Sequence, residues 1–134
     1  MKSKDRWTNS RTAVYNLGYH LIWCPKYRRK VLVGEVENRL KELMREKADE
    51  LNITIEQMEV MPDHIHVFIK AKPTLSPHFI IQQFKGFSAR KLRDEFPELK
   101  TKLPNMWTRS YFAESVGHIS EETFKTYIEQ QKNK

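Results

Sequence analysis

Two histidines separated by one apolar residue form the part of this sequence best suited to chemistry. His64 and His66 lie in the stretch Met-Pro-Asp-His-Ile-His-Val-Phe-Ile, residues 61–69. A β-strand directs alternate side chains to opposite faces, so both imidazoles would lie on one face, about 7 Å apart along the strand. The apolar side chains that alternate with them would face a core. This pattern predicts a metal ion shared by two imidazoles on a rigid strand.

The composition favours a polyanionic partner. The chain has 134 residues, a length that predicts a single domain over residues 1–134. Lys and Arg number 24 against 17 Asp and Glu, a formal net charge of +7. Nucleic acid is the commonest partner of so basic a domain, although many basic proteins bind no polyanion. The single cysteine, Cys24, excludes an internal disulfide and fits a reducing, prokaryotic cytoplasm, and no apolar run approaches the roughly 20 residues of a membrane span.

Apolar periodicity predicts seven elements that would position the two histidines. Strands are expected over residues 13–23, 53–60, 64–71 and 107–116, and helices over 35–51, 76–94 and from 120 onward. Ser76 as N-cap and Pro77 as first helical residue mark the start of the second helix, and Gly86 within it predicts close packing. Residues 1–12 are expected to form a loose basic arm, and the segment with Pro97 and Pro104 a loop.

The order of these elements predicts an α+β fold. The pattern β-α-β-β-α-β is that of the ferredoxin-like (RRM-like) fold, a four-stranded antiparallel sheet with two helices on one face, here followed by one more helix. If Ile65, Val67 and Ile69 pack under the two helices, His64 and His66 lie on the open face. A ligand could reach them there.

The last helix would add a second set of functional groups. Phe124, Tyr127, Ile128 and Gln131 recur at the spacing of one helical face, with Tyr127 and Gln131 one turn apart. If that face docks over the open sheet, a phenol and an amide oxygen come close to the imidazoles. Two histidines and one oxygen ligand leave coordination positions open, as in a catalytic metal site. Taken alone, each feature has a simpler explanation: a chance His-x-His, and a core tyrosine on an amphipathic helix.

Together these motifs resemble a known family. The stretch around His64 and His66, with Tyr127-x-x-x-Gln131 near the carboxyl end, resembles the single-tyrosine HUH transposases of small insertion sequences (the insertion sequence 200/605 type). Three further segments resemble that family in the same order: Trp-Cys-Pro-Lys-Tyr-Arg-Arg at 23–29, Lys-Gly-Phe-Ser-Ala-Arg at 85–90 and Trp-Thr-Arg-Ser-Tyr-Phe at 107–112. The resemblance extends from about Tyr15 to Gln131.

The resemblance implies an activity and a role for each matching residue. It implies a ferredoxin-like domain that dimerises, binds a divalent metal, and cleaves and rejoins single-stranded DNA, with possible hairpin ends, through a 5′-phosphotyrosine. His64, His66 and Gln131 would hold the metal and Tyr127 would be the nucleophile, delivered to the histidines of a second subunit. The family favours Mg²⁺ or Mn²⁺, and imidazole ligands favour Mn²⁺ over Mg²⁺. Asp63 could orient an imidazole or could serve only as a turn residue.

Basic residues beside aromatic ones predict the DNA contacts. Cations mixed with stacking surfaces suit single strands. One such patch lies near Trp23 and Tyr27, a second lies on the second helix, and a lone arginine is expected near the sheet centre, within the last strand. The predicted contacts are Lys26, Arg28, Arg29 and Lys30 in the first patch, Lys85, Arg90, Lys91 and Arg93 in the second, and Arg109 in the strand.

Three alternative functions remain open at the level of sequence. The first is a non-catalytic RRM-like nucleic-acid-binding protein, although the expected strand aromatics are missing. The second is a metal-independent two-histidine phosphoesterase, for which His118-Ile119-Ser120 supplies only one of the two motifs needed. The third is a structural zinc protein, which lacks a fourth Cys or His ligand nearby.

Overall fold

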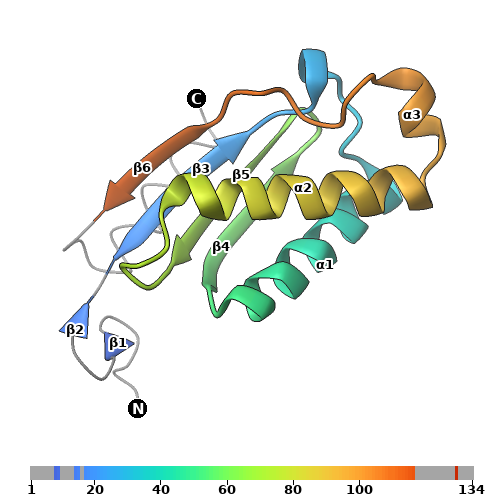
Figure 1. The fold of residues 1–134 in the computed structure, drawn as a ribbon. Coiled ribbons are helices and arrows are strands. Elements are labelled where there is room, and N and C mark those ends of the chain that lie inside the picture. Colours follow the sequence, from blue (N-terminus) through green and yellow to red (C-terminus); the bar gives the residue numbers. More distant parts are fainter. Residues whose placement is uncertain (1–7, 10–13, 16, 117–128, 130–134) are drawn as a thin grey trace.

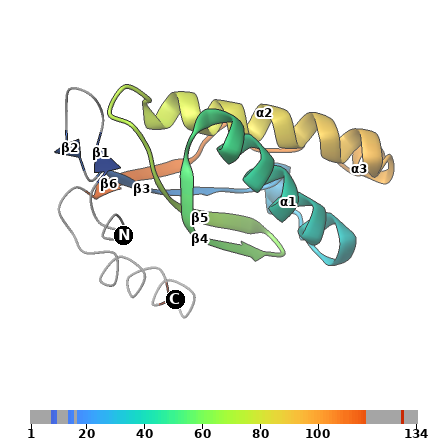
Figure 2. The same cartoon turned by 90° about the horizontal axis from the view of Figure 1, so that it is seen from below.

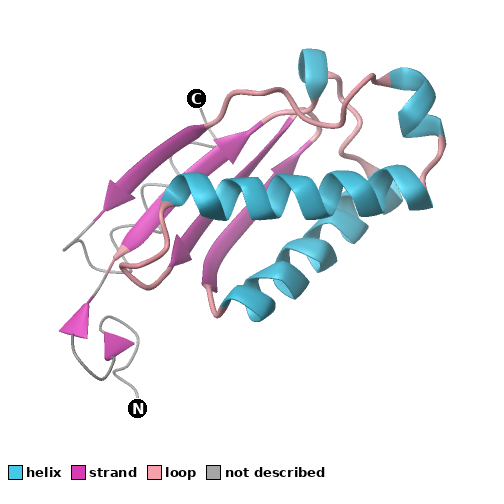
Figure 3. Ribbon diagram, in the orientation of Figure 1, coloured by secondary structure: helices cyan, strands magenta, loops and turns pink. Residues whose placement is uncertain are grey.

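The computed structural model of the chain describes residues 8–9, 14–15, 17–116 and 129 (Figures 1 and 3). Most of the predicted amino-terminal arm and the predicted carboxyl-terminal helix, with Tyr127 and Gln131, lie outside the described residues. Within the arm, β1 (Thr8–Asn9) pairs with β2 (Val14–Tyr15) as a two-stranded ribbon. The expectation of a loose arm is therefore wrong at Thr8 and Asn9, which take part in strand pairing.

Four strands form the predicted antiparallel sheet. In spatial order these are β4 (Thr54–Met61), β5 (His64–Lys70), β3 (Gly18–Trp23) and β6 (Phe112–Val116). Every neighbouring pair is antiparallel, and β3 and β5 lie in the centre. This is the strand order of the ferredoxin-like fold, so the predicted fold class is confirmed.

Two long helices cover one face of the sheet (Figures 1 and 2). They are α1 (Gly34–Leu51) and α2 (Pro77–Glu95), and they pack against each other as well as on the strands. The predicted start of α2 is confirmed, since the Ser76 hydroxyl accepts a hydrogen bond from the Phe79 amide at 3.1 Å and Pro77 occupies the first helical turn. α1 ends at Leu51, and the capping residue Asn52, with a left-handed φ of 58°, stops the helix.

The core lies between the sheet and these helices because alternate strand residues point toward them. Leu21 and Trp23 of β3 and Ile65, Val67 and Ile69 of β5 are each at most 1% exposed. The predicted packing of Ile65, Val67 and Ile69 under the two helices is thus confirmed, and Leu21 and Trp23 follow the same alternation in β3. Trp23, however, stacks on Phe84 of α2 and meets Trp107 edge to face, so it is a core residue and not a stacking surface for DNA.

The segment between α2 and β6 differs from the prediction. The expected loop contains a short helix, α3 (Glu98–Lys102), and β6 begins only at Phe112 instead of near Trp107. Trp107 makes an isolated bridge with Pro25 before the chain reaches the sheet. Arg109 is therefore outside the strand and exposed, so the prediction of a charge near the sheet centre is wrong.

Gly86 provides a test of helix stability. A Cβ atom built on Gly86 meets nothing within 4 Å, so the expected close packing is absent. Gly86→Ala should then raise the free energy of unfolding by about 1 kcal/mol, because alanine has the higher helix propensity. Urea denaturation measures this change.

The matched control is the second glycine at a helix. Gly34 has a φ of +58°, which disfavours any L side chain, so Gly34→Ala should lower the free energy of unfolding. A decrease for Gly86→Ala would mean that this position of α2 packs more closely than described.

Candidate metal centre

The two predicted histidines come together at the start of β5. Their ring centroids are 4.7 Å apart with an interplanar angle of 59°. Both lie on the sheet face opposite α1 and α2, as the alternation with buried Ile65 and Val67 requires. The His64 side chain is 25% exposed, whereas His66 is 8% exposed. The pair thus combines one imidazole that solvent reaches with one that is nearly buried.

Asp63 fixes the orientation of His64. Its Oδ1 lies 2.7 Å from His64 Nδ1, and its Oδ2 accepts a hydrogen bond from Arg28 Nη2 at 2.9 Å. These interactions, the hydrogen bond with His64 first, lower the pKa of Asp63, so this side chain is a carboxylate at neutral pH. A neutral His64 then donates its Nδ1 proton to the carboxylate and keeps the lone pair on Nε2 for a metal.

A third histidine, His20 of β3, contacts His66. His20 Nε2 lies 3.4 Å from His66 Nδ1, and His20 is 1% exposed. The sequence interpretation missed this residue, although a signal existed. Because Tyr19, Leu21 and Trp23 alternate toward the helices, His20 had to lie on the other face, and β3 pairs directly with β5.

The electrostatic environment keeps His66 in the form that binds metals. Burial, with smaller effects of His64 and His20, lowers the pKa of His66 to about 4. Burial also lowers the pKa of His20. Metal ligation requires unprotonated imidazole, and His66 satisfies that requirement at neutral pH.

The two imidazoles fit a divalent metal, but they do not complete a site. Both have their Nδ1 atoms next to a protein group, which leaves Nε2 of each available, and imidazole is a good ligand for Mn²⁺ or Zn²⁺. Within residues 17–116 and 129, no set of three His, Cys, Asp or Glu side chains is arranged to hold a metal. Gln131, the predicted third ligand, lies outside the described residues.

Comparison with known proteins identifies the family of this chain. The family model described as "Transposase IS200 like" matches residues 13–131. The ISDra2 transposase TnpA of Deinococcus radiodurans is 42% identical over 123 residues, which cover 90% of this chain and 88% of that protein. The chain belongs to the IS200-like transposase family. Transposition of DNA is therefore its activity.

Other relatives agree with this family. The transposase of insertion sequence element IS200 from Salmonella typhimurium is 32% identical, over 77% of this chain and 69% of that protein. The crystal structure of a putative transposase from Deinococcus radiodurans superimposes with a TM-score of 0.77 at 37% identity, over 92% of this chain and 97% of that one. A REP-associated tyrosine transposase bound to a REP hairpin shares the fold, with a TM-score of 0.60 at 12% identity over 90% and 67% of the two chains.

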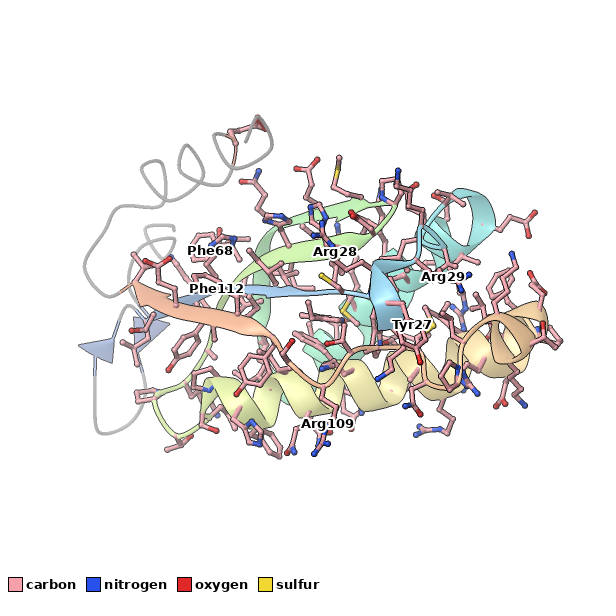
Figure 4. All side chains as sticks on the ribbon, turned by 90° about the horizontal axis from the view of Figure 1, so that it is seen from above. Tyr27, Arg28, Arg29, Phe68, Arg109 and Phe112 are labelled. Carbon is pink, nitrogen blue, oxygen red and sulfur yellow. The ribbon has the colours of Figure 1, made fainter. Side chains whose placement is uncertain are left out.

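The first basic patch of this transposase lies beside the histidine pair. The short helical turn η2 (Lys26–Arg28) presents Tyr27, which is 65% exposed, with Lys26 Nζ 5.3 Å from its ring centroid (Figure 4). Tyr27 and Arg28 have φ values of 61° and 53°, a left-handed conformation that costs a non-glycine residue free energy. Arg29 and Lys30 follow as exposed residues. The left-handed turn directs Arg28 toward Asp63 and leaves the ring of Tyr27 in solvent.

The second basic patch lies on the other side of the molecule. Arg90 is exposed on α2, and Figure 4 shows Arg109 near that helix, on the opposite side of the sheet from Arg28. Arg90 and Lys91 lie with their cations 5.9 Å from the ring centroid of Phe87. The predicted DNA contacts are thus divided between two surfaces, and only the turn at Arg28 adjoins the histidines.

Lys85 is engaged within the protein. Its Nζ donates to the carbonyl oxygens of Thr108 and Ser110 at 2.6 and 3.3 Å and lies 3.5 Å from that of Arg109. Burial lowers the pKa of Lys85. This lysine therefore holds the segment before β6 against α2.

None of the described helices is long and apolar enough to cross a membrane.

The buried His66 predicts a pH dependence of stability. Its pKa is about 4 in the folded chain, and a histidine in an unfolded chain titrates near 6.5, so between these values the unfolded state binds more protons. The free energy of unfolding should fall as the pH falls from 6.5 to 4, with up to about 3 kcal/mol from His66. His20, whose pKa is also lowered, adds an effect of the same sign.

Urea denaturation of the wild type and of His66→Gln at several pH values in this range measures the effect. The variant should lose stability less steeply on acidification because it lacks one titrating group. Equal slopes for the two proteins would show that His66 is not held neutral by burial.

Proposed function

We propose that this transposase cleaves and rejoins single-stranded DNA at insertion-sequence ends through a 5′-phosphotyrosine on Tyr127, at a divalent metal centre that includes His64 and His66. The observation that carries the proposal is the arrangement of the two imidazoles. They lie 4.7 Å apart, with Nδ1 of one against Asp63 and Nδ1 of the other against His20. In this arrangement Nε2 of each ring would be the nitrogen that binds the ion.

Gln131 would supply the third protein ligand through its amide oxygen. Its position four residues after Tyr127 puts both side chains on one face of the predicted helix. When bound, Mn²⁺ or Mg²⁺ would polarise a non-bridging oxygen of the scissile phosphate and hold the phosphate in line for attack. Two imidazole ligands favour Mn²⁺ over Mg²⁺ in affinity.

Tyr127 would perform the covalent step. A phenol in water has a pKa near 10, so Tyr127 would have to lose its proton as it attacks the phosphorus. The bond from phosphorus to the 3′-oxygen breaks, and that oxygen takes up a proton as a free 3′-hydroxyl. The new phosphotyrosine keeps the energy of the phosphodiester, so attack by another 3′-hydroxyl reverses the step and joins new ends. Because the energy of the phosphodiester is kept, the reaction suits strand transfer.

The surface next to the histidines supports a single-stranded substrate. The exposed ring of Tyr27 with Lys26 above it combines a stacking platform with a cation, as binding of unpaired nucleotides requires. Arg28 and Arg29 would contact phosphates there, and Arg90 and Arg109 would contribute on the α2 side, whereas Lys85 is already bound to backbone carbonyl oxygens. The structural neighbour bound to a REP hairpin makes a hairpin end a reasonable substrate for this chain as well.

The proposed assembly is a homodimer. Within the described sheet β6 is an edge strand, and Phe112 on it is 48% exposed, so this edge offers backbone groups and apolar area for an interface. Each subunit would deliver Tyr127 to the histidines of its partner.

Replacing the nucleophile tests the covalent mechanism. Tyr127→Phe should abolish a protein–DNA adduct, because phenylalanine has no attacking oxygen, and should leave binding of the oligonucleotide within about twofold. The measurement is incubation of a labelled single strand from an insertion-sequence end with Mn²⁺, followed by a denaturing gel. An adduct that persists in the variant would refute the role of Tyr127. Full cleavage in EDTA would instead favour a metal-independent phosphoesterase, and binding without cleavage by the wild type would favour the RRM-like alternative.

Mixing two inactive variants tests the exchange of Tyr127 between subunits. Tyr127→Phe keeps the histidines, and His64→Ala keeps the tyrosine. Heterodimers of the two should recover cleavage, because one of their two composite sites is intact. The same gel measures recovery, with each variant alone as the control. Absence of recovery from verified heterodimers would place Tyr127 and the histidines in the same subunit.

A further inference from the structure

His20 is a buried histidine to which neither the motif nor the proposed mechanism assigns a role. It lies in the centre of β3, where Ile22, two residues further on, pairs with His66 across the strands. Its ring centroid is 5.5 Å from that of His66 and 5.9 Å from that of Phe112. At 1% exposure, His20 is unable to contact DNA directly. Among the described residues, the contact that links His20 to the candidate metal centre is the one with His66.

The contact between the two histidines allows two arrangements of the proton. If His20 donates from Nε2, His66 accepts at Nδ1 and carries its own proton on Nε2, where it blocks a metal. If His66 donates from Nδ1, His20 accepts at Nε2, and His66 Nε2 keeps its lone pair. Only the second arrangement permits ligation through Nε2. We propose that His20 is a positioning residue that accepts the Nδ1 proton of His66 in a hydrogen bond and so leaves Nε2 of His66 free for the metal. This inference rests on the metal centre proposed above.

The geometry of the neighbouring histidine supports this assignment. His64 is held in the same way, by an acceptor at its Nδ1, and that acceptor is Asp63. The contact of 3.4 Å between His20 and His66 is longer than the 2.7 Å of the Asp63 contact. Hydrogen bonds at catalytic groups are often long in the free enzyme and shorten when the ligand is bound.

Burial explains why the acceptor for His66 is an imidazole and not a carboxylate. The Asp63 side chain is 21% exposed and is paired with Arg28, so it retains its charge at low cost. At the position of His20, next to Phe112 and close to the nearly buried Phe68, a carboxylate would be a buried charge, which is expensive unless it is paired. A neutral imidazole accepts the same hydrogen bond without that cost.

Metal affinity, measured without DNA, tests the role of His20. We expect His20→Phe, which keeps a ring in the core but removes the acceptor, to weaken Mn²⁺ binding about 10- to 100-fold. His20→Gln, whose Oε1 can take the place of the accepting nitrogen, should restore most of the affinity. His78→Phe is the matched control. His78 lies exposed on α2 and is hydrogen-bonded to Tyr111, so its substitution should leave Mn²⁺ affinity unchanged. Isothermal titration calorimetry with MnCl₂ gives the dissociation constants.

A second measurement uses the unmodified, metal-free chain and does not depend on any variant folding. Long-range ¹H–¹⁵N spectra at neutral pH report which imidazole nitrogen carries the proton. We expect the proton of His66 on Nδ1. A proton on Nε2, or equal Mn²⁺ affinity for His20→Phe and the wild type, would overturn the inference.

The same titrations separate this inference from the proposed function. If the wild type binds no Mn²⁺ and resembles His64→Ala, the metal centre itself is refuted and the role of His20 with it. If the wild type binds Mn²⁺ and His64→Ala does not, the metal centre stands, and the comparison of His20→Phe with His20→Gln then decides the role of His20.

Discussion

The packing of Ile65, Val67 and Ile69 under α1 and α2 is the constraint on which the rest of the structure depends. These side chains are at most 1% exposed, and they alternate with His64 and His66. A shift of β5 by one residue would turn the apolar side chains to the open face and the histidines into the core. The cost of that exchange, several kcal/mol for three large apolar groups, fixes the register. The core thereby sets the position of the two candidate metal ligands.

The two sides of the candidate metal centre differ in how they hold an imidazole. His64 depends on a charged chain that runs from Arg28 through Asp63, and Arg28 is largely exposed. His66 depends on a neutral, buried contact. Salt screens the exposed pair more strongly than the buried one. Ionic strength should therefore act on the proposed metal centre mainly through Arg28 and Asp63, on the side where the proposed DNA contacts also lie.

The sequence predicts what depends on local periodicity, and it does less well where distant segments meet. The strand around His64, the helix that begins at Ser76 and the fold class follow from alternation and capping, because each signal lies within one element. The buried contact of Trp23, the exposed position of Arg109 and the pairing of Arg28 with Asp63 depend on how elements pack, which a single sequence does not contain. His20 lies between these cases. Its face could be predicted from its neighbours, but its distance from His66 needed the sheet.

The engagement of Lys85 affects how mutations at basic residues are interpreted. Its ammonium sits among backbone carbonyls of the segment that leads into β6, so a phosphate could bind it only by displacing them. Substituting Lys85 would release that segment and shift the edge strand, together with Phe112 beside His20. A loss of DNA binding in such a variant would then report a displaced scaffold, and it would be no measure of a direct contact with the nucleic acid.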